Sequence, residues 1–169
     1  MCKYFIYDKI IVYNARGVSR RQMFFEETRG YKILRKGGLM RMRDIVISIR
    51  NDFIAQAVIG SLEKSGEFQP FKLLFSRDDE VVHECARIKP ELLLCEVAFG
   101  MHTDFETRMK EANEVRKVHK NCKVVFLCDE NSSPVLAKRV MQAKRDGLID
   151  AFFYSSVGSR YLVAALTAM

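Results

Sequence analysis

Five cysteines and three histidines are the residues in this 169-residue sequence best suited to metal binding or nucleophilic chemistry. Zinc sites in proteins draw their ligands from Cys or His pairs a few positions apart. His83 and Cys85 are two positions apart, whereas His102 and His119 lie in separate segments, and the sequence has no CxxC pair. We therefore expect no metal and no cofactor, and we interpret the cysteines as reduced, small core residues.

Residues for enzymatic chemistry are also missing from the places where they would be needed. Arg50-Asn51-Asp52 follows the first predicted strand, where a phosphate-binding loop would be rich in glycine. Cys95 and Cys128 end predicted strands, but no histidine stands at a matching strand end to activate either thiol. The sequence predicts a non-enzymatic protein without a small-molecule substrate.

Positive charge is concentrated at the start of the chain. The net charge is +7, from 28 Lys and Arg against 21 Asp and Glu, and a basic protein of this kind can bind nucleic acid. Residues 1–41 contain ten basic and three acidic residues, so residues 42–169 are balanced, with 18 of each sign. We expect two parts, a basic leader of residues 1–41 and a domain of residues 42–169 without direct nucleic-acid contact.

From Asp44 onward, short apolar runs alternate with segments that have helical periodicity. Asp52 is the expected N-cap of the first helix, and Gly66 its end. The predicted strands are 45–49, 71–75, 92–95, 123–128 and 151–154, and the predicted helices are 52–65, 78–89, 104–119, 134–145 and 159–168. This order predicts an α/β fold with a parallel sheet covered on both faces.

Parallel sheets of this kind bind and react at the carboxyl ends of their strands. The candidate functional residues are therefore those that end or follow the predicted strands: Ile49, Arg50, Asn51, Glu96, Val97, Cys128, Asp129, Ser155 and Ser156.

Three segments resemble the receiver domains of bacterial response regulators, the CheY-like superfamily. Residues 90–97 resemble the third strand, with a proline and an acid before an apolar run and Glu96. Residues 123–128 resemble the fourth strand, and residues 146–155 resemble the approach to the fifth. The resemblance spans residues 43–166 and implies a flavodoxin-like (βα)5 three-layer sandwich with strand order 2-1-3-4-5.

The family's phosphorylation chemistry does not carry over to this sequence. In receivers an acidic pair and an aspartate phosphoacceptor hold Mg²⁺, and a Thr or Ser and a Lys stabilise the phosphoryl group. The resemblance places the acidic pair at Ile49 and Arg50, the phosphoacceptor at Glu96, the Thr or Ser at Cys128 and the Lys at Ser155. Since all five positions differ, the chain is identified as a degenerate pseudo-receiver that is not phosphorylated.

Arg50 and Glu96 suggest a replacement for the metal site. One hypothesis is a bidentate Arg50–Glu96 ion pair that holds the domain in one signalling conformation. The alternative is that both are solvated, uncoupled residues at the rim of a pocket.

The resemblance also places a switch aromatic at Phe152, although a Phe in a buried strand is equally explained as a core residue. The face that receivers use for dimers and partners corresponds to residues 134–169. We expect a protein partner or a second copy of the chain there, and no membrane contact.

The basic leader has two interpretations. Arg35-Lys36-Gly37-Gly38 can be encoded by codons containing AAAGGAGG, which resembles a ribosome-binding site just ahead of Met40 and Met42. The leader is then upstream DNA translated from a wrongly assigned start. Otherwise it is a genuine basic arm that binds nucleic acid or adds a hairpin to the body.

Three functions remain open at this point. The first is a phosphorylation-independent signalling module that acts through protein contacts in the cytoplasm, since the sequence has neither a signal peptide nor a run of about 20 apolar residues. The second is the receiver part of a transcription regulator whose DNA-binding domain lies beyond residue 169. The third is a flavodoxin-like enzyme.

Overall fold

The computed structural model describes residues 6–7, 10–11, 31–33, 39–74, 80–99, 103–129 and 133–169. The chain divides into two units, Met1–Arg41 and Met42–Met169. Within the first unit, β1 (Ile6–Tyr7) pairs antiparallel with β2 (Ile10–Ile11), and β3 (Tyr31–Ile33) pairs antiparallel with β4 (Leu39–Arg41).

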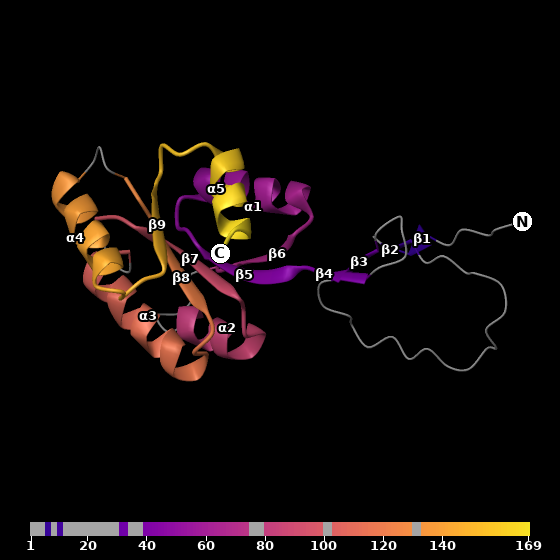
Figure 1. Ribbon diagram of the computed structural model, residues 1–169, viewed down its shortest axis with the longest axis horizontal. Helices are drawn as coiled ribbons and strands as arrows, with labels where there is room; N and C mark the ends of the chain where they lie inside the picture. Colours follow the sequence, from indigo (N-terminus) through magenta and orange to yellow (C-terminus); the bar gives the residue numbers. More distant parts are fainter. Residues whose placement is uncertain are drawn as a thin grey trace, which may run out of the picture. The chain divides into compact units, whose positions relative to one another are not determined.

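The second unit alternates strands and helices from its first residues to its last (Figure 1). The strands are β5 (Arg43–Ser48), β6 (Phe68–Lys72), β7 (Leu92–Val97), β8 (Lys123–Cys128) and β9 (Ala151–Tyr154), and the helices are α1 (Asp52–Ser65), α2 (Glu80–Ile88), α3 (Phe105–Val118), α4 (Pro134–Arg145) and α5 (Ser159–Thr167). All five strands are parallel, and their order is β6-β5-β7-β8-β9. This is the predicted 2-1-3-4-5 order, so the flavodoxin-like (βα)5 prediction is confirmed.

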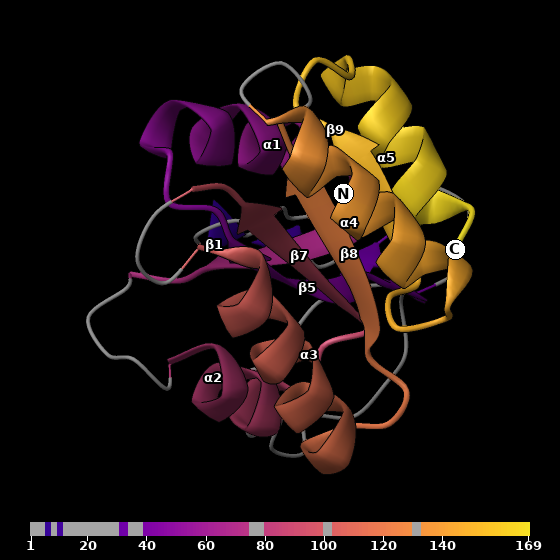
Figure 2. The ribbon, with the colours of Figure 1, turned by 90° about the vertical axis from the view of Figure 1, so that its left-hand side faces the viewer.

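Helices cover both faces of the sheet, with α1 and α5 on one face and α2, α3 and α4 on the other (Figures 1 and 2). Successive strand residues point to opposite faces. Ile45 and Leu92 therefore pack into the core beneath α1 and α5, whereas Val46 and Leu93 pack into the core beneath the other three helices. Because both faces are buried, the central strands consist almost entirely of apolar residues.

The first helix is capped one residue earlier than predicted. Asn51, not Asp52, is the N-cap of α1, and its side-chain oxygen accepts a hydrogen bond from the Ile54 N–H at 3.2 Å. Asp52 is the first helical residue and pairs with Lys72. Gly66 ends the helix with a left-handed φ of 68°, which glycine adopts without strain.

β6 begins three residues before the predicted strand of residues 71–75. It contains Pro70, and proline usually interrupts a strand. β6 is an outer strand. On either side of it, the Glu67 carbonyl accepts the Arg43 N–H and the Leu73 N–H donates to the Ile47 carbonyl. Because alternate residues of a strand bond the same neighbour, the odd-numbered residues face β5 and the nitrogen of Pro70 faces the open edge, where a missing N–H breaks no bond within the sheet. On the same edge the Leu74 N–H donates to Glu80 Oε1 at 2.7 Å.

Within the part of the chain that the structure describes, none of the helices has the length and apolar composition needed to cross a bilayer.

Candidate functional site

The carboxyl ends of the strands bring several of the predicted site residues together. The register pairs Ser48 with Cys95, Val97 with Cys128, and Cys128 with Tyr154, so four strand ends are adjacent. A pocket of about 160 Å³ opens at this edge. Its described lining residues are Asn51, Ile54, Glu96, Val97, Ala98, Leu127, Cys128, Asp129 and Ser155.

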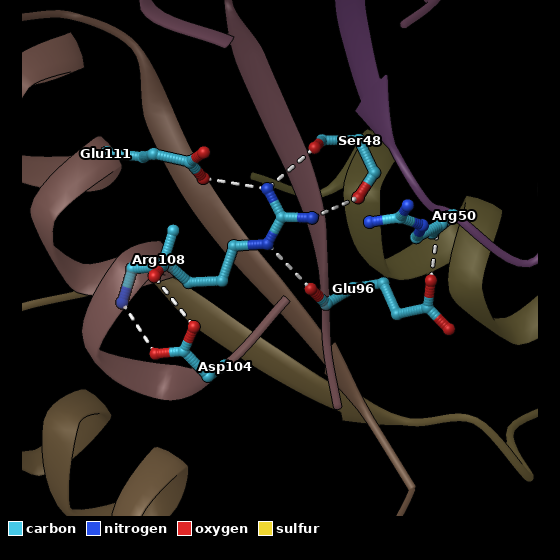
Figure 3. Close-up of polar contacts among 7 residues, drawn as sticks. Ser48, Arg50, Glu96, Asp104, Arg108 and Glu111 are labelled. Atoms are coloured by element: carbon cyan, nitrogen blue, oxygen red, sulfur yellow. Dashed lines mark hydrogen bonds and ion pairs between the residues drawn. The ribbon is translucent and has the colours of Figure 1, made fainter. Parts of the chain in front are cut away.

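Glu96, the next-to-last residue of β7, is half-buried and held by the main chain of the neighbouring strand end. Its Oε2 accepts a hydrogen bond from the N–H of Arg50 at 2.7 Å (Figure 3) and another from the N–H of Asn51 at 3.1 Å. Both N–H groups lie at the start of α1, where the helix dipole is positive and favours an anion. The carboxylate of Glu96 is thereby fixed between β5 and β7.

Arg50 therefore contacts Glu96 through its main chain in the structure, whereas the hypothesis above assigned the contact to its guanidinium. The Arg50 side chain is exposed. Ile49, the other position of the expected acidic pair, is fully buried in the core with Ala55 and Val58. Ile49 is not among the described residues that line the pocket.

Cys128 and Ser155 lie at the opposite side of the pocket. Cys128 is the buried last residue of β8, and its carbonyl accepts the Ser155 N–H at 2.8 Å. Phe152 is half-buried against the core, and its ring meets Tyr154 edge to face, with ring centres 5.6 Å apart. Cys128 and Ser155 thus contribute small side chains to the pocket wall.

Arg108 on α3 was missed by the sequence reasoning. Its side chain is 1% exposed and lies between the ends of β5 and β7 (Figure 3). The Nε donates to the carbonyl of Glu96 at 2.9 Å, and NH1 donates to Ser48 Oγ at 2.8 Å and Glu111 Oε2 at 2.7 Å. One guanidinium thus joins two strands and a helix directly behind the pocket.

The helical periodicity of residues 104–119 held a signal for this burial. Position 108 is four residues before Ala112 and seven before Val115, so the three share one face of α3. Ala112 and Val115 are both buried. An arginine on this stripe, with an acid three residues later at Glu111, indicates a buried ion pair.

Asp104 fixes the start of α3 and therefore the position of Arg108. Its carboxylate accepts hydrogen bonds from the Thr107 N–H at 3.0 Å and the Thr107 hydroxyl at 2.7 Å. These two bonds hold the pKa of Asp104 below its usual value. Cys95, beside this site on β7, is fully buried, which raises its pKa to about 12.

A larger hollow, of about 550 Å³, lies between β6 and α2, but its polar side chains already have partners. Glu84 pairs with Arg87 and with His83, and Glu80 accepts the Leu74 N–H. The two hydrogen bonds from Arg87 hold the pKa of Glu84 below its usual value. The pocket at the strand ends is therefore the better candidate site.

Comparison with known proteins shows what this architecture is similar to. The sequence matches no protein-family model and no curated protein. A two-component response regulator from Clostridium difficile is 16% identical, with a TM-score of 0.59 over 75% of this chain and 94% of that chain. CheY4 from Vibrio cholerae is 15% identical, with a TM-score of 0.58 over 75% of this chain and 98% of that one. A CheY-like protein, tadZ, from Pseudomonas aeruginosa is 13% identical, with a TM-score of 0.57 and the same coverage.

The chain has the CheY-like receiver fold. The resemblance inferred from three sequence segments is thereby confirmed at the level of the fold.

The receiver fold implies a Mg²⁺ site at this edge of the sheet, and the residues present do not fit one. Mg²⁺ takes hard oxygen ligands in octahedral geometry. Ile49 provides none, Arg50 provides a cation, and Oε2 of Glu96 already accepts two N–H groups. Among the described residues no group of three Asp, Glu, His or Cys side chains could hold a metal ion.

Proposed function

We propose that residues 42–169 are a non-enzymatic, cytoplasmic regulatory module of the receiver type, whose output does not depend on phosphorylation. It acts by contact with a protein partner or a second copy of itself. The observation that carries the proposal is the state of Glu96, whose carboxylate is bound by the main-chain N–H groups of Arg50 and Asn51.

Phosphoryl transfer to a carboxylate needs an oxygen that can attack and cations that neutralise the developing charge. One oxygen of Glu96, Oε2, accepts two N–H donors, and the described lining of the pocket includes no Lys or Arg that could neutralise the developing charge. Arg108 is a buried cation near Glu96, but it donates to the main-chain carbonyl of Glu96 and to the Ser48 hydroxyl, not to the carboxylate. These contacts support a strand end held in one conformation.

The proposed partner surface consists of α4, β9 and α5, residues 134–169. Val135, Tyr154 and Tyr161 expose large apolar side chains on these elements. The ring of Tyr161 also meets Phe153 edge to face at 6.4 Å, which orients it against the strand. Ordered, exposed aromatic residues are typical anchors of protein interfaces.

The basic residues of α4 divide into two groups. Arg139 pairs with Glu106 at 2.5 Å, and its guanidinium lies 4.3 Å from the centre of the Phe105 ring, so it joins α4 to α3. Lys138 and Lys144 are exposed. The proposed surface therefore combines apolar and positive side chains, and an acidic patch on the partner would complement it.

A titration with Mg²⁺ and beryllofluoride, followed by NMR of the full chain, tests the proposal. Beryllofluoride mimics a phosphoryl group on a carboxylate, so a working acceptor gives saturable shifts at its neighbours. We expect no saturable shift at residues 48–51 or 96–98. Glu96→Gln is the control, because shifts that persist in this variant arise elsewhere. A saturable shift near Glu96 in the parent chain alone would refute the proposal.

A further inference from the structure

Large apolar side chains are exposed all along the carboxyl edge of the sheet. Eight such residues are exposed in the described part of the chain, and six of them follow or end a strand. In the spatial order of the strands these are Leu74 after β6, Phe53 after β5, Phe99 after β7, Val135 after β8, and Tyr154 and Tyr161 at the end of β9 and in the first turn of α5. The other two, Val118 and Leu148, are at the opposite edge.

The three of these six residues that lie outside residues 134–169 are the most exposed. Phe53 is 91% exposed, Leu74 is 80% exposed and Phe99 is 75% exposed. Strands in a sheet are about 4.8 Å apart, so five strand ends span roughly 20 Å. Exposed apolar side chains gathered along one edge of a folded protein indicate an interaction site, and we call this row the rim.

The pocket of Glu96 opens at the same edge of the sheet. Glu96 and Asp129 both line it, and its described lining residues include no Lys or Arg. Both described hydrogen bonds to the Glu96 carboxylate use Oε2, so Oε1 can accept another donor. The pocket volume of about 160 Å³ is below the roughly 300 Å³ at which small-molecule sites begin, and suits one inserted side chain.

We propose that this edge docks a protein segment that inserts one Lys or Arg side chain into the pocket and covers Phe53 and Phe99 with flanking apolar residues. The inference rests on the proposed function, and it adds a second surface, beyond residues 134–169. Charge complementarity selects the occupant: a cation can pair with Oε1 of Glu96, whereas the phosphates of a nucleic acid would be repelled by this carboxylate. The rim excludes water around the charged contact, which strengthens it.

Short peptides test the proposal without knowledge of the natural partner. The probes are acetyl-Phe-Lys-Phe-amide, the same peptide with norleucine in place of lysine, and the same peptide with glutamate. Each is titrated into the full chain, and amide shifts are followed by NMR. We expect the lysine peptide to give saturable shifts at residues 51, 96–98, 129 and 155. The norleucine peptide should bind about fivefold or more weakly, and the glutamate peptide not at all.

Two pairs of matched variants separate this edge from general hydrophobicity. Phe53→Ser and Phe99→Ser should each weaken binding of the lysine peptide about tenfold, because each removes an exposed anchor of the rim. Val118→Ser and Leu148→Ser remove apolar side chains at the opposite edge and should leave the affinity within about twofold. Glu96→Gln should reduce the preference for lysine over norleucine.

Other outcomes would overturn the inference in distinguishable ways. Shifts confined to residues 134–169 would support the proposed function and refute the second surface. Equal binding of the lysine and norleucine peptides would refute the cationic anchor. Edge shifts that depend on protein concentration without peptide would identify a second copy as the occupant instead. A response to Mg²⁺ and beryllofluoride would refute phosphorylation independence without affecting the peptide result.

Discussion

Arg108 is the residue on which the organisation of the site depends most. It carries a full charge at 1% exposure, and its donors contact β5, β7 and α3. Removing one partner of a buried ion pair leaves the other charge without compensation, which costs more than the pair contributes. The site is therefore stable with Arg108 and Glu111 both present, or with both replaced by neutral residues.

We expect Arg108→Met to lower the free energy of unfolding by about 3 kcal/mol, because Glu111 and the Ser48 hydroxyl lose their donor. Arg108→Met combined with Glu111→Gln should recover part of this loss. Urea denaturation measures both. Lys110→Met, at an exposed position of the same helix, is the control and should change stability by no more than about 0.5 kcal/mol. If Arg108→Met matches the control, the network is not stabilising.

The buried thiols should be unreactive in the folded chain. Burial raises the pKa of Cys95 to about 12, and a hydrogen bond with Cys122 together with burial raises the pKa of Cys85. Thiolate is the reactive form, so iodoacetamide at pH 8 should leave both unmodified in the native state and modify both in urea. Peptide mass spectrometry reads this out. Equal labelling in both conditions would show that the core around these thiols opens readily.

How much of the site could be predicted from sequence depends on the residue. Glu96, Cys128 and Ser155 were placed at strand ends by the apolar runs before them, and the structure brings all three to one pocket. Ile49 was expected to face the same site, but it is fully buried in the core beneath α1 and α5. The main-chain contacts of Arg50 could not be predicted, since they depend on loop geometry rather than on side-chain type.

At the scale of the elements, α3 shows how one cap positions the buried arginine. Asp104 accepts from the Thr107 N–H and hydroxyl, and this starts the helix so that position 108 faces the sheet. A side chain at the N-cap stabilises a helix by about 1 kcal/mol. The cap also contributes a pH dependence that can be measured.

Because the folded pKa of Asp104 is lowered, its stabilisation is present above the unfolded pKa of about 3.9 and is lost as pH falls through the folded value. We expect Asp104→Ala to cost about 1 kcal/mol at pH 7. Asp104→Asn keeps a capping oxygen and should retain most of that stability at pH 7. Because Asn does not titrate, the variant should lack the fall in stability that protonation of Asp104 causes below about pH 4. Thermal unfolding at pH 7 and pH 3 distinguishes the two. Identical pH profiles of Asn variant and parent would contradict the assignment.

Element order was predictable because apolar runs and helical segments alternate, and parallel strands require crossovers. The start of β6 was not. Pro70 lies in the middle of that strand, and a proline is acceptable there only because β6 is at the outside of the sheet. Strand position within the sheet is a property of the tertiary fold, so a local pattern could not reveal it.

At the scale of the whole molecule, the chain divides between residues 41 and 42. We propose that residues 42–169 fold without residues 1–41, whether the leader is a genuine arm or the result of a wrongly assigned start. All the described residues of the two cores that flank the sheet belong to the second unit.

A chain that begins at Met42 should keep the amide NMR pattern of residues 48–169 and should melt within about 3 °C of the full chain. The full chain serves as the reference in the same buffer. A molten spectrum, or a melting temperature more than about 8 °C lower, would show that the leader contributes to the fold. Mass spectrometry of the N-terminus from native cells separately tests the start assignment, because a peptide from residues 5–30 would exclude a start at Met40 or Met42.

The outer edge of β6 has a consequence for how the chain behaves when it is concentrated. Fibrils grow when an exposed strand accepts another strand through free main-chain donors and acceptors. On this edge Pro70 has no N–H to donate, and the Leu74 N–H is bound to Glu80. Growth from this strand is therefore disfavoured, and replacing Pro70 with a β-branched residue should make the protein more prone to form fibrils.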